Sequence, residues 1–452
     1  VIVTHDYQVD VGYQCVGRFT ILELIPLAYG YFIHWLAILR AASLPSQYSS
    51  RRPYIYVSSS SALSSRNFLI YLVGSTISLH GLWIYRVALG WFAWQLTGSE
   101  FWVGIIAFSQ FAPAVFFGPL FGVIADRVDR RLASIVINAC SGANMLLLGG
   151  LVAFGHVDIT MLTFLSLLQG ALDGAHTPVR MTLVPNLVSR EQLQSAIAST
   201  SISFNLSRLI GPAIAGVIIA TRGVSTAFLV NGLSYLAIVG AVFFVRLRPL
   251  ASHDKKTGDV WSELLDGVRY VRDHSRIRSL LVMIAVGSVF GRGALEMLPA
   301  IADAVLERGS AGLAILTSVM GVGAVATGLV LARSTHWLDI RIIRLSIVFA
   351  GVFIAGFGAN SSFGLAVALV TVLGILLSLG GVGSQILLQS LVDEAVRGRV
   401  SSLWGMIAFG GTALGSLVVG AAAATFGLQA TVVAGGLLCA VFALIPRYTR
   451  AS

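Results

Sequence analysis

The feature that most constrains this sequence is an apolar run of about 18 or more residues, which recurs along most of the chain and matches a helix crossing a hydrocarbon core of roughly 30 Å. Hydrophobic residues make up 56% of the 452 residues, and the mean hydropathy is +0.85. Lipid offers no hydrogen-bond partner to a free backbone group, so only helices or closed barrels span a bilayer, and runs this long are helical. We therefore predict an all-α, polytopic membrane protein.

Hydropathy from residue 66 onward predicts twelve transmembrane helices in two sets of six. The first set covers 67–96, 100–125, 131–154, 158–184, 192–220 and 223–245. The second set covers 277–302, 310–332, 341–360, 363–388, 399–425 and 427–446. The polar interval between the sets carries apolar residues at helical spacing, which predicts an amphipathic helix on the membrane surface: Trp261, Leu264, Leu265, Val268 and Val271.

These patterns divide the chain into five parts. We expect an N-terminal extension (1–65), a six-helix bundle (66–245), a cytoplasmic linker (246–276), a second six-helix bundle (277–446) and a cytoplasmic tail (447–452). The two bundles share sequence, because LVPNLVSREQLQSA at 183–196 parallels LVDEAVRGRVSS at 391–402, and LIGPAIAG at 209–216 parallels ALGSLVVG at 413–420. The similar offsets, 391 − 183 = 208 and 413 − 209 = 204, predict two pseudo-symmetric halves.

Basic residues between the predicted helices determine the orientation. If the first helix begins in the cytoplasm, 21 Lys and Arg residues fall on the cytoplasmic side and only Arg222 and Arg308 on the other side. This asymmetry also accounts for the net charge of +10 without a nucleic-acid partner.

The segment GPLFGVIADRVDRR at 118–131 lies between the second and third predicted helices, on the cytoplasmic side. It resembles the loop motif of the major facilitator superfamily, of the form G-x-x-x-D-R-x-G-R-R, and Asp129 stands where the motif has glycine. The matching residues are Gly122, Asp126, Arg127, Arg130 and Arg131. Together with LGWFAWQLTGS at 89–99, TPVRMTLVPNLV at 177–188 and NLSRLIGPAIAG at 205–216, the loop resembles the enterobactin-exporter-like branch of bacterial efflux carriers, the transmembrane secretion effectors.

The loop residues are therefore candidate gating residues. An Asp126 carboxylate is stabilised at the N-terminus of a neighbouring helix, and the adjacent arginines can pair with acidic side chains. The resemblance implies the same role, stabilisation of the state closed to the cytoplasm. The alternative is that these charges only follow the positive-inside rule.

Five ionisable residues lie well inside predicted membrane spans: Arg86, Asp173, Arg208, Arg292 and Glu296. Each costs about 2.5–3.5 kcal/mol at the bilayer centre, so we expect them to face a polar cavity or one another. The fold that the resemblance implies places the third, sixth, ninth and twelfth spans at the periphery, and their interiors carry no charge. Three positive and two negative charges favour an anionic or amphipathic substrate.

Residues in two of these spans are candidates to carry a proton. Asp173, His176 and Arg180 share a face of the fourth span and could hold or pass a proton. Glu296 is a second candidate, although it also could simply pair with Arg292 four residues earlier. In the fifth span, Gly211, Pro212 and Gly216 predict a bend or a close helix approach and partly resemble an antiporter motif, which favours efflux.

The first 65 residues allow two interpretations. The run FTILELIPLAYGYFIHWLAIL at 19–39 is long enough for a thirteenth span, but it contains Glu23, Pro26 and His34. Alternatively, the residues before Val57 are a translation artefact or an extension.

We therefore predict a proton-coupled secondary exporter of a siderophore, drug or secondary metabolite, acting as a monomer in a bacterial inner membrane. The sequence has no GxxxxGK[ST] phosphate loop, so we expect the proton gradient, not ATP, to be the energy source. No cofactor is expected. The alternatives are an importer of the same fold and a non-transporting membrane sensor. An enzyme is not expected, because the eight histidines form no cluster with acidic residues.

Overall fold

The computed structural model describes residues 61–246, 260–394 and 396–445, except for the side chains of 119–120, 122–127, 182 and 260–264. The chain divides into two compact units, Val1–Ser58 and Ser59–Ser452, and the described residues belong to the second. The alternatives for residues 1–65 fall almost wholly outside them. Helices account for all regular secondary structure among the described residues, as predicted.

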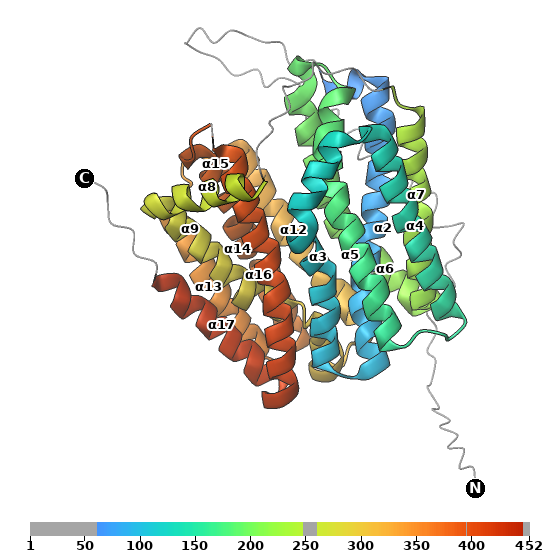
Figure 1. Ribbon diagram of the computed structural model, residues 1–452. Helices are drawn as coiled ribbons and strands as arrows, with labels where there is room; N and C mark the ends of the chain where they lie inside the picture. Colours follow the sequence, from blue (N-terminus) through green and yellow to red (C-terminus); the bar gives the residue numbers. More distant parts are fainter. Residues whose placement is uncertain (1–60, 247–259, 395, 446–452) are drawn as a thin grey trace. The chain divides into compact units, whose positions relative to one another are not determined.

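The helices of the first half follow the six predicted spans closely (Figure 1). They are α2 (Arg66–Thr97), α3 (Glu100–Arg127), α4 (Arg130–Ala153), α5 (Ile159–Leu183), α6 (Leu193–Arg222) and α7 (Val224–Phe244). Three short 3₁₀ turns lie at the predicted cytoplasmic ends: η1 (Ala62–Ser64), η2 (Val184–Leu187) and η3 (Arg190–Gln192).

The second half is less regular. Its seventh span is composed of α9 (Ser275–Val286), η4 (Gly287–Arg292), α10 (Gly293–Leu295), α11 (Leu298–Ala300) and η5 (Ile301–Val305). Its tenth span is composed of α14 (Phe363–Ser378), η6 (Leu379–Gly383) and α15 (Ser384–Leu391). The others are α12 (Gly309–Arg333), α13 (Ile340–Gly358), α16 (Arg397–Phe426) and α17 (Leu428–Leu444).

Ten helices of the described residues are long and apolar enough to cross a membrane. The two remaining predicted spans correspond to α5 and α17. Helix α17 has 17 residues and is just short of the expected length. Helix α5 has 25 residues, but Asp173, His176 and Arg180 lower its apolar character.

Each half forms a bundle with its own peripheral pair of helices. In the first half α4 packs against α7, and in the second half α13 packs against α17. These four helices correspond to the third, sixth, ninth and twelfth predicted spans. The bundles meet through two further pairs: α3 with α16, which Figure 1 shows side by side, and α6 with α12.

Small residues allow these two inter-bundle contacts. A Cβ atom at Gly104 of α3 would lie 2.5 Å from the carbonyl oxygen of Ser416 in α16. A Cβ atom at Gly216 of α6 would lie 2.3 Å from the Cβ atom of Ala314 in α12. Gly216 and Gly420 end the two related octapeptides 209–216 and 413–420, and Gly420 also lies against α3. The sequence repeat thus corresponds to equivalent contacts in the two halves.

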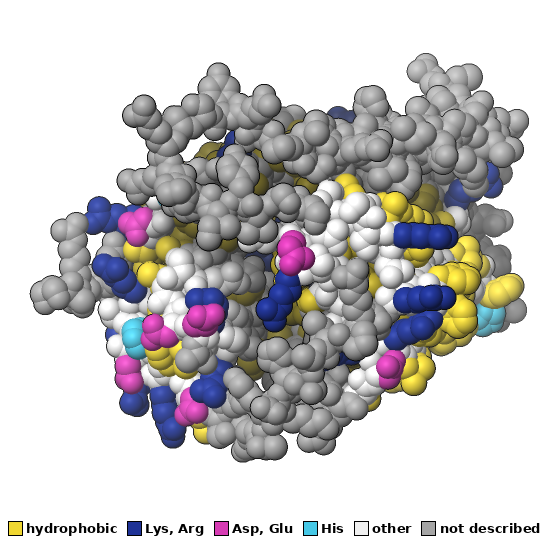
Figure 2. Space-filling model, turned by 90° about the horizontal axis from the view of Figure 1, so that it is seen from above, with side chains coloured by type: hydrophobic (Ala, Val, Ile, Leu, Met, Phe, Trp, Pro, Cys, Tyr) yellow, Lys and Arg dark blue, Asp and Glu magenta, His cyan; other side chains and the backbone are white. Residues whose placement is uncertain are grey.

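The amphipathic helix in the linker is α8 (Val260–Asp273). It docks on the second bundle, where the Tyr270 hydroxyl donates to Asp393 Oδ2 at 3.0 Å and Arg399 Nη1 lies 3.6 Å from Asp266 Oδ2. Leu265 and Val268 are exposed, whereas the side chains of Trp261 and Leu264 are outside the described residues. Figure 2 looks down on this end of the unit, where basic and acidic side chains gather.

Candidate transport site

Of the five charged residues predicted inside the membrane, four interact with the fifth, Arg86 of α2. Arg86 attracts the carboxylates of Asp173 in α5 and Glu296 in the seventh span. It also repels two other guanidinium groups, those of Arg208 in α6 and Arg292 at the end of η4. The five residues come from both bundles and form one electrostatic cluster, which we call the charged centre.

Aromatic rings lie beside two cations of the charged centre, Arg86 and Arg208. The Arg86 guanidinium carbon lies 5.1 Å from the Trp83 ring centroid and 5.5 Å from that of Phe111. The guanidinium carbon of Arg208 lies 5.6 Å from the Trp83 ring. Cation–π attraction of this kind is worth about 2 kcal/mol or more in a desolvated site. Phe111 also stacks on Phe409 of α16 at 6.4 Å, so the aromatic lining reaches the second bundle.

A hydrogen-bonded chain fixes Asp173 to the first bundle. Gln169 Nε2 lies 3.0 Å from both Asp173 Oδ1 and the Tyr235 hydroxyl, and it can donate to each. Gln169 Oε1 in turn accepts from Asn144 Nδ2 at 3.2 Å. Gln169, Asn144 and Tyr235 are buried, and they connect α5 to α4 and α7. Sequence reasoning missed Gln169, although it is four residues before Asp173 and therefore on the same helix face.

The predicted triplet in α5 separates into two environments. Asp173 interacts with Arg86 and Gln169, whereas His176 lies close enough to Arg180 for electrostatic repulsion. Arg180 also interacts with Tyr71 of α2, nearer the predicted cytoplasmic end. The structure therefore places Asp173, but not His176 or Arg180, with the other intramembrane charges. The predicted pair Arg292 and Glu296 attract each other, with Arg292 at the end of η4 and Glu296 in the turn that follows α10.

His80 adds a polar contact between α2 and α6 that the sequence analysis did not use. Its Nδ1 atom lies 2.8 Å from the Thr76 carbonyl oxygen and 3.0 Å from Ser207 Oγ. Thr76 Oγ1 lies 3.0 Å from Ser203 Oγ on the same side of α6. Ser207 directly precedes Arg208, so this seam positions the segment that carries a cation of the charged centre.

The glycine and proline residues of α6 lie at close helix approaches. Helix α6 continues from Leu193 to Arg222 with Pro212 inside it. A Cβ atom at Gly211 would lie 2.5 Å from the Trp83 Cβ atom, and Gly216 touches α12 as described above. Gly211 thus allows α6 to approach the aromatic residue that contacts both Arg86 and Arg208.

The predicted gating loop connects α3 to α4. The side chains of Gly122, Asp126 and Arg127 lie outside the described residues. Arg130 is partly exposed at the start of α4. Arg131 Nη2 donates to the Phe243 carbonyl oxygen of α7, with its guanidinium carbon 5.7 Å from the Phe243 ring.

Asp129, the departure from the glycine of the loop motif, caps α4. Its Oδ1 atom accepts a hydrogen bond from the Leu132 amide at 2.7 Å, and its φ of −62° requires no glycine. The substitution therefore has a local structural role in the N-cap.

Comparison with known proteins agrees with this architecture. A family model described as transmembrane secretion effector matches residues 57–450. The chain is 25% identical to the staphyloferrin A transporter of Staphylococcus aureus over 374 residues, covering 81% of this chain and 90% of that protein. It is 26% identical to the multidrug efflux pump Tap of Mycobacterium tuberculosis over 388 residues, covering 81% and 89%.

The enterobactin exporter EntS of Escherichia coli is 24% identical over 353 residues, covering 76% of this chain and 82% of that protein. Among solved structures, a bacterial homologue of the human lysosomal transporter Spinster, in an inward-facing and occupied conformation, superposes with a TM-score of 0.67 at 13% identity. That superposition covers 87% of this chain and 100% of the other. It shows the same fold.

Proposed function

This chain belongs to the transmembrane secretion effector family of major facilitator superfamily transporters, and we propose that it is a proton-coupled exporter of a small anionic or amphipathic molecule. The proposed location is the plasma membrane of a bacterium, the inner membrane where there are two. The observation that carries this proposal is the charged centre, in which two other cations and two carboxylates from both bundles surround Arg86.

Protonation of Asp173 provides the coupling that we propose. While Asp173 is ionised, its carboxylate attracts the Arg86 guanidinium, and a proton on Asp173 removes this attraction. Because an inward-moving proton drives export only when it is not carried together with the substrate, we propose that Asp173 is ionised in the substrate-loaded carrier and protonated in the empty carrier that returns. Gln169 holds the carboxylate in place during both steps, because its amide can donate to either form.

The proposed substrate class follows from unpaired donors and from net charge. Besides three guanidinium groups, the site contains Trp83 Nε1, which is buried and has no hydrogen-bond acceptor among the described residues. A molecule with carboxylate or phenolate oxygens and an apolar or aromatic surface satisfies these donors and stacks on Trp83 and Phe111. The relatives are named for transport of staphyloferrin A, of multiple drugs and of enterobactin, and we propose a cargo of comparable kind for this chain.

Alternating access is supported by where the bundles touch. Three contacts between the bundles lie toward the predicted outer ends of the helices. They are Gly104 with Ser416, Gly216 with Ala314, and the hydrogen bond that Trp94 Nε1 donates to Asp303 Oδ2 at 2.9 Å. We propose that these contacts close the outer side in this state and that they separate when the transporter faces outward.

Proteoliposomes with an imposed proton gradient test this function. A panel of catecholate and citrate-based siderophores and amphipathic drugs is added, and a pH-sensitive dye reports gradient dissipation while compound flux is measured separately. At least one compound should dissipate the gradient through the wild-type protein. Asp173→Asn should lose this proton flux but retain exchange of the compound, because the isosteric amide cannot ionise.

The matched control is Asp129→Asn. It also removes one carboxylate, but asparagine is an equally good N-cap and the residue lies outside the membrane span. Equal proton flux through the two variants contradicts the role of Asp173. If the wild-type protein responds to no compound of the panel, the proposed substrate class is contradicted. If the compound moves across the membrane in the same direction as the protons, the proposed export is contradicted.

A further inference from the structure

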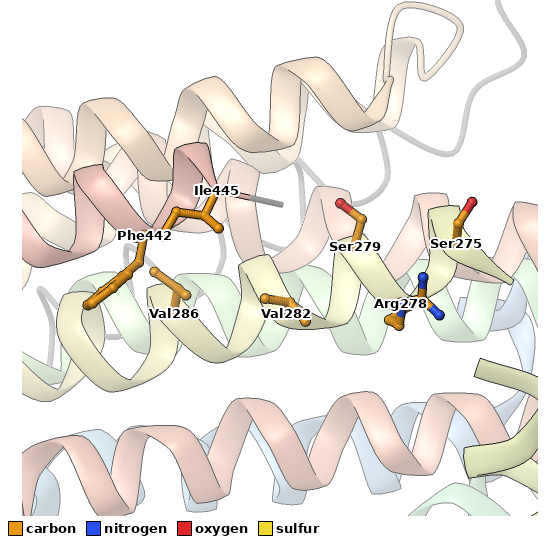
Figure 3. Close-up of a pocket in the computed structure, with 7 residues that line it drawn as sticks. All are labelled: Ser275, Arg278, Ser279, Val282, Val286, Phe442 and Ile445. Atoms are coloured by element: carbon orange, nitrogen blue, oxygen red, sulfur yellow. The ribbon is translucent and has the colours of Figure 1, made fainter. Parts of the chain in front are cut away.

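A groove lies on the surface of the second bundle, between α9 and α17 (Figure 3). Its volume is about 300 Å³, and it is lined by Ser275, Arg278, Ser279, Val282, Val286, Phe442 and Ile445. None of these residues belongs to the charged centre. The groove therefore calls for an explanation separate from transport of the substrate.

The two ends of the groove differ in chemistry. Figure 3 shows Ser275, Arg278 and Ser279 together at one end of α9 and Val286 with Phe442 toward the other end. Ser275 begins α9, whose N-terminus is predicted to lie on the cytoplasmic side. The polar end therefore lies at the level of the inner-leaflet headgroups, and the apolar end lies at the level of the acyl chains.

Ser279 supplies a second, independent indication of a ligand. Its side chain is only 6% exposed, and its Oγ atom has no hydrogen-bond partner among the described residues. A helical serine usually bonds to a carbonyl of the preceding turn, and a buried hydroxyl without a partner costs about 1–3 kcal/mol. A hydrogen-bond acceptor from outside the chain would remove this cost.

Arg278 supplies the matching charge. Its Nη1 atom donates to the Arg272 carbonyl oxygen at 2.5 Å, which holds the guanidinium at the polar end of the groove. Guanidinium groups bind phosphate oxygens through charge-assisted hydrogen bonds, and cationic residues at the cytoplasmic surface attract anionic lipids.

We propose that this groove is a binding site for an anionic phospholipid of the inner leaflet. The phosphate contacts Arg278 and the hydroxyl groups of Ser275 and Ser279, and one acyl chain lies along Val282, Val286 and Phe442. A lipid bound here contacts both the seventh and twelfth spans and stabilises their packing.

The test is the thermal stability of the purified full-length protein in detergent, titrated with phosphatidylglycerol, phosphatidylcholine or glycerol 1-phosphate. Phosphatidylglycerol should raise the melting temperature at the lowest concentration, phosphatidylcholine should be weaker, and glycerol 1-phosphate should have little effect because it has no acyl chain. Equal effects of the two lipids, or a full effect of glycerol 1-phosphate, would overturn the proposal.

Three variants locate the effect. Arg278→Gln should weaken the apparent affinity for phosphatidylglycerol by about fivefold, the loss expected for one cation near an anionic headgroup. Arg276→Gln, which removes the same charge from an exposed residue that does not line the groove, should change it much less. Ser279→Ala should weaken the lipid effect but leave the lipid-free protein equally or more stable, since a buried unpaired hydroxyl is removed. If Arg278→Gln and Arg276→Gln respond alike, the groove is not the site.

Discussion

Replacement of Gly104 by alanine should shift the transporter away from the state in which α3 and α16 touch. The new Cβ atom would lie 2.5 Å from the Ser416 carbonyl oxygen and 3.1 Å from the Gly420 Cα atom. Carbon and oxygen atoms normally approach to about 3.3 Å, so the two helices must separate by roughly 0.8 Å at this level. Both nearest atoms belong to the backbone, so a change of side-chain rotamer cannot relieve the contact.

The size of the shift follows from the cost of overpacking. Adding one methyl group to a close-packed contact costs about 1–3 kcal/mol. In an alternating-access cycle only the state with this contact is strained, so the ratio of the two states should change by about 5- to 150-fold toward the outward-open one.

Distances between spin labels measure this shift. Labelled cysteines at Phe101 and Phe426, both exposed near the predicted outer ends of α3 and α16, would report the separation of the bundles in a background without the three native cysteines. Gly104→Ala should increase the population at the longer distance. The control is Gly118→Ala in the same helix, where a new Cβ atom would meet none of the described atoms within 4 Å. If Gly104→Ala has the distance distribution of the unsubstituted protein, or if Gly118→Ala shifts it equally, the contact does not control the closed outer side.

Substitutions at three further positions test local features by thermal unfolding. Asp129→Ala should destabilise the protein by about 0.5–2 kcal/mol through loss of the α4 N-cap, and Asp129→Gly by only a few tenths; equal losses contradict the capping role. Tyr270→Phe should cost about 0.5–1.5 kcal/mol, because Asp393 loses a donor that ties α8 to the second bundle; an unchanged melting temperature contradicts this. Gln169→Leu should cost about 1–3 kcal/mol, because Asp173 and Tyr235 each lose the buried hydrogen bond from its amide, whereas an exposed substitution such as Gln95→Leu should cost far less.

Much of the fold was predictable because the bilayer imposes a simple rule on sequence. Long apolar runs must be helices, and the helix bounds in the structure differ from the predicted spans by only a few residues at most ends. The family resemblance drawn from the loop motif is confirmed by the family match over residues 57–450. The spans at α5 and α17 are the weakest by length or hydropathy, since α5 carries polar and charged residues and α17 is short.

The candidate site was predictable only in part. The high cost of charge in lipid identified Arg86, Asp173 and Glu296 as residues that must find partners. Which partners they find depends on helix rotation and on packing between distant segments, neither of which appears in hydropathy. Gln169 was recoverable from its spacing to Asp173, but the contact of Trp83 with both Arg86 and Arg208 required the structure.

The π-helical segment η4 determines the direction of the second half of the seventh span. Each residue of an α-helix turns the chain by about 100°. A π-helical turn is wider and accommodates one extra residue, so every residue after it is rotated about the helix axis by about that angle. Arg292 ends η4 and Glu296 follows it. Deleting one residue from the wide turn would restore the α-helical repeat and rotate Glu296 by more than a quarter turn, away from the side on which it now meets Arg86. The orientation of this carboxylate is therefore encoded by the number of residues before it as much as by their identity.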